Sequence, residues 1–187
     1  ATGGREAYDA LNISVADMAA RYTATIASLM AAVSAMADAS TDTVVNKRIS
    51  ALLNLMEGKE RVGLQRAYGS VGFSAGGFTP YIYQQFVSMM AAKDAFFSRF
   101  KTLAGPDARA AFGEALADPA FQKAALLEQV AVQSITSSGK TTGITSQQWF
   151  EQITLKISLL QSVDAQMSAA SVQTAAEGRS AAWSEFS

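Results

Sequence analysis

The sequence contains no cysteine and no histidine, only three prolines, and few charged residues, which make up 17% of its 187 positions. Without cysteine the chain has no disulfide, no thiolate metal ligand and no thiol nucleophile. Without histidine it lacks the side chain that most often ligates metals and transfers protons near neutral pH. We therefore expect a protein that is not an enzyme, with no metal site and no cofactor.

Charge and hydropathy exclude further classes of function. The 15 Lys and Arg against 16 Asp and Glu give a formal net charge of -1, so no overall field attracts nucleic acid and any anion site must be local. The sequence has no run of 18 apolar residues and the start, Ala1 to Arg5, is no signal peptide. We expect one soluble domain over residues 1–187, with membrane anchoring only through segments outside it.

Apolar residues recur at three- and four-residue steps along most of the chain, which is typical of amphipathic helices. No segment alternates with a period of two between turn signals. The pattern predicts an all-α fold, an antiparallel helical bundle with long helices and short polar or Gly-containing turns. The expected helices cover about 14–39, a segment beginning after Asp42, 81–103, 107–117, 118–134 and 145–176, with 177–187 frayed or leading to another module.

Local signals set the ends of these helices. Asp42 and Asp118 are suited to cap the helices that follow them, and Thr145 with Gln148 has capping-box spacing. Gly105 with Pro106 predicts a stop after Leu103. The segment from Gly72 to Pro80 holds three glycines, so we expect the second helix to break there and the segment to act as a hinge.

The second helix carries an apolar stripe whose spacing continues into charged residues. Its members are Val45, Ile49, Leu52 and Met56, and the same phase then reaches Lys59, Gly63 and Arg66. Arg61 is five residues from Arg66, about 140° around the helix. The phase therefore predicts that Arg66 rather than Arg61 faces the interior, with space beside it at Gly63.

An inward guanidinium needs a partner, because an unpaired buried charge is costly. That partner is either a small oxyanion, whose planar shape matches the donor fork of arginine, or a carboxylate such as Glu57, Glu60 or Asp94. Spacing alone favours the carboxylate, because structural ion pairs are common. Lys93 also interrupts an apolar stripe, where an exposed stem over the core is favoured over a second cationic group.

The segment Lys59-Glu60-Arg61-Val62-Gly63-Leu64-Gln65-Arg66-Ala67 resembles a motif of the nitrate- and nitrite-sensing (NIT) domain family of bacterial receptors. The segments Phe73 to Phe78 and Ile144 to Ile157 also resemble segments of this family, and they follow in the same order along the chain. The resemblance implies that Gly63 and Arg66 contribute to a site for nitrate or nitrite between long helices, with Lys59 and Arg61 beside them. Gln65 stands where the family commonly has Glu.

The resemblance implies a sensory domain of a chemoreceptor or a related signalling protein, in the periplasm or alternatively in the cytoplasm. Its partners would be a small anion and a second copy of the chain in a homo-oligomer. Residues 1–187 are then one such domain or a part of a larger one. The alternative function is a helical dimerisation or protein-interaction module of a receptor that binds no small ligand.

Overall fold

The structure is a computed structural model that describes residues 31, 35, 42–141 and 143–185, with side chains described up to Ala170. These residues form five α-helices and a short 3-10 helix, and the all-α class is confirmed. The elements are α2 (Thr43–Ser74), α3 (Pro80–Leu103), α4 (Pro106–Ala117), α5 (Pro119–Gln133), η1 (Ser134–Ser137) and α6 (Ser146–Glu185). The helix expected at 14–39 lies outside the described residues apart from positions 31 and 35.

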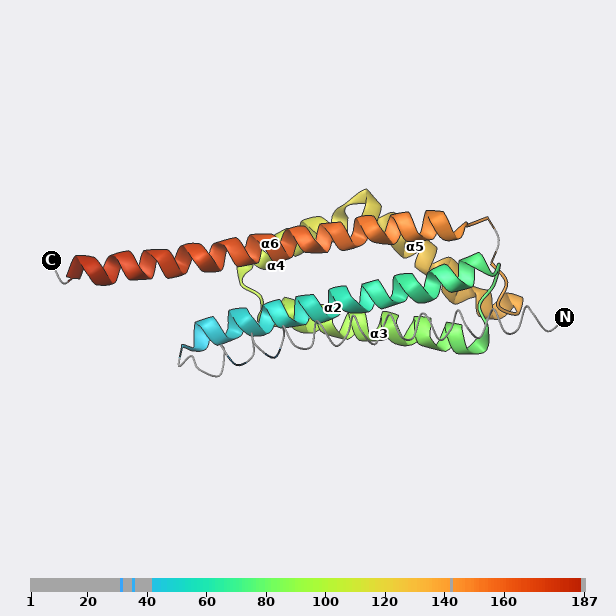
Figure 1. The fold of residues 1–187 in the computed structure, drawn as a ribbon, viewed down its shortest axis with the longest axis horizontal. Helices are drawn as coiled ribbons and strands as arrows, with labels where there is room; N and C mark the ends of the chain where they lie inside the picture. The colour runs from blue at the N-terminus through green and yellow to red at the C-terminus, as the bar shows by residue number, and fades with distance from the viewer. Residues whose placement is uncertain (1–30, 32–34, 36–41, 142, 186–187) are drawn as a thin grey trace.

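The described helices form an elongated bundle in which α2 lies beside both α3 and α6 (Figure 1). α2 runs antiparallel to each of them, while α4 and α5 contact α6, and α5 also contacts α3. The long α6 extends beyond the start of α2. Within the described residues, no helix combines the length and the hydropathy that a membrane crossing requires.

The helix ends follow the predicted local signals. Asp42 Oδ1 accepts a hydrogen bond from Val44 N at 2.7 Å, and Asp118 Oδ1 accepts one from Ala120 N at 2.7 Å. The capping box is complete, since Thr145 N donates to Gln148 Oε1 at 2.9 Å and Gln148 N donates to Thr145 Oγ1 at 3.1 Å. Among the described helices, the far end of α6 differs from the prediction, because the helix continues to Glu185.

The segment between α2 and α3 breaks the helix as predicted, and backbone hydrogen bonds join it to a second loop; its role as a hinge stays a prediction. Gly76 has a φ of 69°, a conformation that favours glycine, and its carbonyl accepts from Thr141 N at 3.1 Å. Phe78 N donates to Gly139 O at 2.5 Å, and the Phe78 ring is buried. Backbone hydrogen bonds and a buried ring therefore join this turn to the loop that precedes α6, so any movement of the one involves the other.

The buried face of α2 differs in phase from the expected stripe. Val45 is 39% exposed, and Leu52 and Met56 are only half-buried. The buried positions are instead mostly small or polar ones: Ala51, Leu55, Gly58, Glu60, Val62, Gln65, Tyr68, Gly69, Gly72 and Phe73. Close helix contact selects small residues at its centre, so a stripe drawn through the largest apolar side chains misplaces the contact.

Three glycines of α2 are the places where aromatic rings lie directly on its backbone. A Cβ added at Gly58 would lie 2.3 Å from the Phe97 ring, one at Gly69 would lie 2.2 Å from the Trp149 indole, and one at Gly72 would lie 2.5 Å from the Phe78 ring. The rings also pack on one another, with centroids of Trp149 and Phe86 5.5 Å apart. The aromatic core therefore requires glycine at these three positions of α2, because any side chain there would overlap a ring.

Candidate functional site

Arg66 lies half-buried on α2 and reaches α6. Its Nη1 donates a hydrogen bond to Thr154 Oγ1 at 2.8 Å, and its guanidinium carbon lies 4.5 Å from the centroid of the Phe150 ring. The Thr154 hydroxyl in turn donates to Phe150 O at 2.7 Å, so the hydroxyl proton is used and a lone pair faces Arg66. A neutral hydroxyl and an aromatic face thus orient the guanidinium between two antiparallel helices.

The backbone of Arg66 is held as firmly as its side chain. The indole Nε1 of Trp149 donates to Arg66 O at 2.8 Å, and Ser70 Oγ donates to the same oxygen at 2.9 Å. Trp149 is fully buried and occupies the space that Gly69 leaves open. The sequence identified Trp149 as a core residue, but it gave no sign of this hydrogen bond across 83 positions.

Lys59 also faces α6, about two turns from Arg66. Its Nζ lies 2.5 Å from Asp164 Oδ2, so the ammonium is neutralised by a carboxylate of the neighbouring helix. Gly63 is half-buried between these two positions. The two cations that share a face of α2 are therefore held at separate points along α6.

Arg61 faces a different neighbour. Its Nη2 lies 2.9 Å from Glu57 Oε2, and its guanidinium carbon lies 5.6 Å from the centroid of the Phe96 ring of α3. Glu60 Oε1 is 3.9 Å from Arg61 Nη1. Two of the carboxylates considered as partners for Arg66 thus lie beside Arg61, and the predicted ligand residues divide between two faces of α2.

Gln65 adjoins Arg66 in sequence and is completely buried. Neither its Nε2 nor its Oε1 has a hydrogen-bond partner among the described residues. A buried amide without partners costs about 1 to 3 kcal/mol. Gln65, which stands where the resembled motif commonly has Glu, is therefore a buried polar side chain without described partners.

A second polar cluster lies in the core, away from Arg66, and we call it the charge trio: Lys93 of α3, Glu128 of α5 and Lys156 of α6. Lys156 Nζ lies 2.6 Å from Glu128 Oε1, and Lys93 Nζ lies 3.0 Å from Glu128 Oε2. All three residues are buried. The expectation that Lys93 is an exposed stem is therefore wrong, because its charge is paired across the bundle.

The charge trio carries one net positive charge when all three groups are ionised. Burial lowers the pKa of Lys156 to about 8, because desolvation of its ammonium outweighs the attraction of Glu128. Burial alone would raise the pKa of the Glu128 carboxyl, but the two ammonium groups together hold it below its usual range. Lys156 Nζ also lies 4.5 Å from the centroid of the Phe121 ring.

The sequence signal for the charge trio was present but weak. Lys156 follows Ile153 and precedes Leu160 at helical spacing, and Glu128 lies between Ala124 and Ala131 in the same way. A charge at a core position is either buried with a partner or extended to solvent. Choosing between these outcomes requires the partner, which here comes from another helix.

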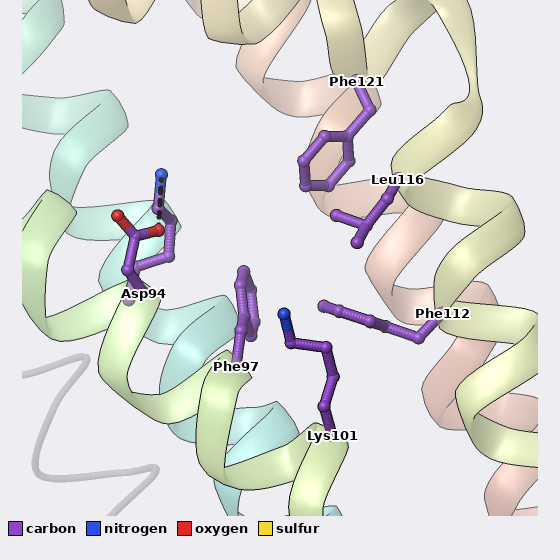
Figure 2. Close-up of a pocket in the computed structure, with 7 residues that line it drawn as sticks. Asp94, Phe97, Lys101, Phe112, Leu116 and Phe121 are labelled. Carbon is purple, nitrogen blue, oxygen red and sulfur yellow. Dashed lines mark ion pairs between the residues drawn. The ribbon is translucent and has the colours of Figure 1, made fainter.

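A groove of about 230 Å³ opens beside the charge trio, between α3 on one side and α4 with α5 on the other (Figure 2). We call it the α3–α5 groove, and its lining residues are Lys93, Asp94, Phe97, Lys101, Phe112, Leu116 and Phe121. Arg66 does not line it. Within the described ranges, no group of three or more carboxylates is placed to hold a metal ion.

Comparison with protein families identifies the chain. The family described as nitrate and nitrite sensing matches residues 2–172. The chain belongs to this family. The matched residues include α2 with Arg66 and the part of α6 that contacts it. Arg66, Trp149 and Thr154 therefore all lie in the region that this nitrate and nitrite sensing domain shares with its family.

One curated relative of this family member is the nitrate regulatory protein of Klebsiella oxytoca. It is 31% identical over 102 residues, which are 54% of this chain and 26% of that protein. The chain thus aligns with about a quarter of the relative's length. No solved structure matches the domain.

Proposed function

We propose that this domain binds nitrate or nitrite at Arg66 and transmits the binding event by shifting α2 relative to α6. Membership of the nitrate and nitrite sensing family supports the choice of ligand, and the name of the Klebsiella relative agrees with it. The observation that carries the proposal is the orientation of the Arg66 guanidinium by Thr154 and Phe150 of a second helix.

The chemistry of the site suits a planar oxyanion. A guanidinium offers parallel N–H donors that match two oxygens of nitrate. Its side chain contacts a hydroxyl and a ring of α6, and the Thr154 hydroxyl can rotate to donate to an anion once it releases Phe150 O. We infer that an anion at this point is contacted from both helices, so binding favours one relative position of α2 and α6.

Titration calorimetry with nitrate and nitrite tests the ligand role of Arg66. We expect saturable heat from the wild-type domain and a loss of affinity of about 10- to 100-fold in Arg66→Ala, equivalent to one charged hydrogen-bonding group. Arg66→Lys should also bind less tightly, because a lysine lacks the paired donors. Arg61→Ala is the matched control, since Arg61 faces α3, and it should bind as the wild type does.

Two results would contradict the proposal. Undiminished nitrate binding by Arg66→Ala would remove Arg66 from the site, and absence of heat from the wild type with either anion would remove the ligand. Spin labels test the transmission separately, because the native chain has no cysteine. With Lys47→Cys on α2 and Ser168→Cys on α6, we expect nitrate to change the distance between the labels.

We further propose that the domain acts as the periplasmic sensory part of a receptor, as one domain, and as a homo-oligomer. Sequences adjoining Ala1 and Ser187 in the full protein test the placement, because membrane helices on either side would indicate a periplasmic domain. Sedimentation analysis tests the assembly. A dimer whose stability is unaffected by nitrate, in a domain that gives no heat, would favour the alternative of an interaction module.

A further inference from the structure

The α3–α5 groove combines three aromatic walls with two lysines, and nothing in the proposed nitrate site uses it. Figure 2 shows the Phe97, Phe112 and Phe121 rings around one space, into which the Lys101 side chain also points. The Phe97 and Phe112 centroids are 5.2 Å apart at an interplanar angle of 65°. Edge-to-face walls of this kind accept a further ring in offset or edge contact.

The size of the groove matches a single aromatic ring with one substituent. Its volume is about 230 Å³, whereas an apolar cavity of about 150 Å³ is enough to hold benzene. Nitrate alone would leave the phenyl walls uncovered. The aromatic part of the lining therefore favours a ligand that brings its own apolar surface.

The charges around the groove favour an anion. Lys93 lines it, and although its Nζ lies 3.0 Å from Glu128 Oε2, that carboxylate is shared with Lys156. The second neighbour of Lys93 is Asp94, at 3.5 Å, whose side chain is 68% exposed and thus well solvated. Among the described residues, Lys101 has no ion-pair partner, so the groove and its floor keep an excess of positive charge.

The walls of the groove are coupled to the charge trio. Phe121 lines the groove on one face, and Lys156 Nζ lies 4.5 Å from its ring centroid. Lys93 belongs to both the lining and the trio. A negative group placed near Lys93 and Lys101 would supply a countercharge to Lys101, next to the charge trio in which three helices, α3, α5 and α6, already meet.

From this combination we propose that the α3–α5 groove binds a small aromatic carboxylate, with its ring between Phe97, Phe112 and Phe121 and its carboxylate toward Lys101 and Lys93. The site is separate from Arg66 and its ligand is different in kind. Occupancy joins α3 to α4 and α5 through one molecule, and it thereby stabilises the packing around the charge trio.

Calorimetric titration of the whole chain with benzoate tests the proposal. Benzamide has nearly the same shape without the charge, and it should bind about fivefold less tightly, the effect of one partly exposed ion pair. Acetate has the charge without the ring, and it should bind about 30-fold less tightly, because the ring provides the apolar contact. Equal affinities of benzoate and benzamide would overturn the role of the lysines.

Two variants locate the site. Lys101→Gln, at an exposed position, should weaken benzoate binding about fivefold, whereas Lys123→Gln on the exposed side of α5 should leave it unchanged. Phe112→Leu should weaken benzoate binding with the helical content, checked by circular dichroism, retained. No saturable binding of benzoate, or the same affinity in Lys101→Gln as in Lys123→Gln, would overturn the proposal.

A third experiment distinguishes benzoate binding in the α3–α5 groove from nitrate binding at Arg66. Benzoate affinity should be the same in Arg66→Ala and in the wild type, whether or not nitrate binds at Arg66. Benzoate that is displaced competitively by nitrate, or lost in Arg66→Ala, would show a shared site and would overturn a separate one.

Discussion

The contact of α6 with α2 and the contact of α6 with α5 are built on different physical principles. On the α2 side, Trp149 lies on the backbone at Gly69 and shape determines the fit there, while the one ion pair described in this contact, Lys59 with Asp164, is partly exposed. On the α5 side, Lys156 pairs with Glu128, and the contact depends on buried charge. A contact made by shape is sensitive to added volume and indifferent to pH, whereas a contact made by charge should show the opposite behaviour.

The largest effect is expected where the charge contact loses its only carboxylate. Glu128→Gln leaves Lys156 buried without a countercharge and leaves Lys93 with only the exposed Asp94 carboxylate at 3.5 Å, which should lower the free energy of unfolding by about 3 to 5 kcal/mol in urea titrations. Asp94→Asn removes a carboxylate that is exposed to solvent and should change stability by less than about 1 kcal/mol. Similar losses in both variants would mean that Glu128 has no special role.

The pH dependence of stability gives the next largest effect and isolates Lys156. Because its pKa is lowered to about 8 in the folded state from 10.5, the unfolded chain binds more protons between these values. Stability should therefore rise above pH 8, by up to about 3 kcal/mol. Burial raises the pKa of Tyr68, which acts oppositely at higher pH, so the rise is best measured below pH 10.

Lys156→Met is the control for that measurement. The variant keeps an apolar stem and has no ammonium, so its stability should not rise between pH 8 and 10 as that of the wild type does. At acid pH the wild type should lose stability as Glu128 is protonated, because a carboxyl with a lowered pKa stabilises the fold only while it is ionised. If the stability of Lys156→Met and of the wild type rose equally between pH 8 and 10, the rise would not come from Lys156.

The shape contact should respond to one added methyl group. Gly69→Ala would bring a Cβ to 2.2 Å from the buried indole, and thermal or urea unfolding should show a loss of about 1 to 3 kcal/mol. Gly113→Ala on the exposed face of α4 meets nothing within 4 Å and should instead stabilise the helix by about 0.5 to 1 kcal/mol. The two substitutions are chemically identical, so opposite signs would isolate packing.

The smallest effect concerns the polar side chain that α2 buries. Gln65→Met keeps a similar length and removes a donor and an acceptor that have no partners among the described residues. Stability should rise by about 1 kcal/mol, measured by urea unfolding at fixed pH. A fall in stability of similar size would show that the amide is hydrogen-bonded to a group that its surroundings supply.

The parts of the fold that sequence reasoning predicted well are those set by neighbouring residues. Asp42, Asp118 and the Thr145–Gln148 pair act within three positions of themselves, and all three caps are present. The phase of α2 was predicted less well, because the packing of two neighbours against one helix decides which residues are buried. Large apolar side chains such as Leu52 then lie at the border of the contact.

The polar centres required information that lies far apart in the chain. Lys93 and Glu128 are separated by 35 positions, and Arg66 and Thr154 by 88. Helical spacing showed that Arg61 and Arg66 point in different directions, and the contacts of Arg61 with α3 and of Arg66 with α6 agree with that prediction. Spacing did not predict that a hydroxyl and a ring would orient Arg66.

The helix α6 takes part both in the Arg66–Thr154 hydrogen bond and in the Lys156–Glu128 ion pair. Thr154 contacts Arg66, and Lys156 contacts Glu128. Two residues of one turn of α6 thus take part in the candidate anion site on one side and in the charge trio on the other. A slide of α6 by one residue's rise, about 1.5 Å, would disturb both contacts at once. Any movement of this helix that a ligand favours must therefore be compatible with a buried ion pair, which limits the positions available to α6 to a small, discrete set.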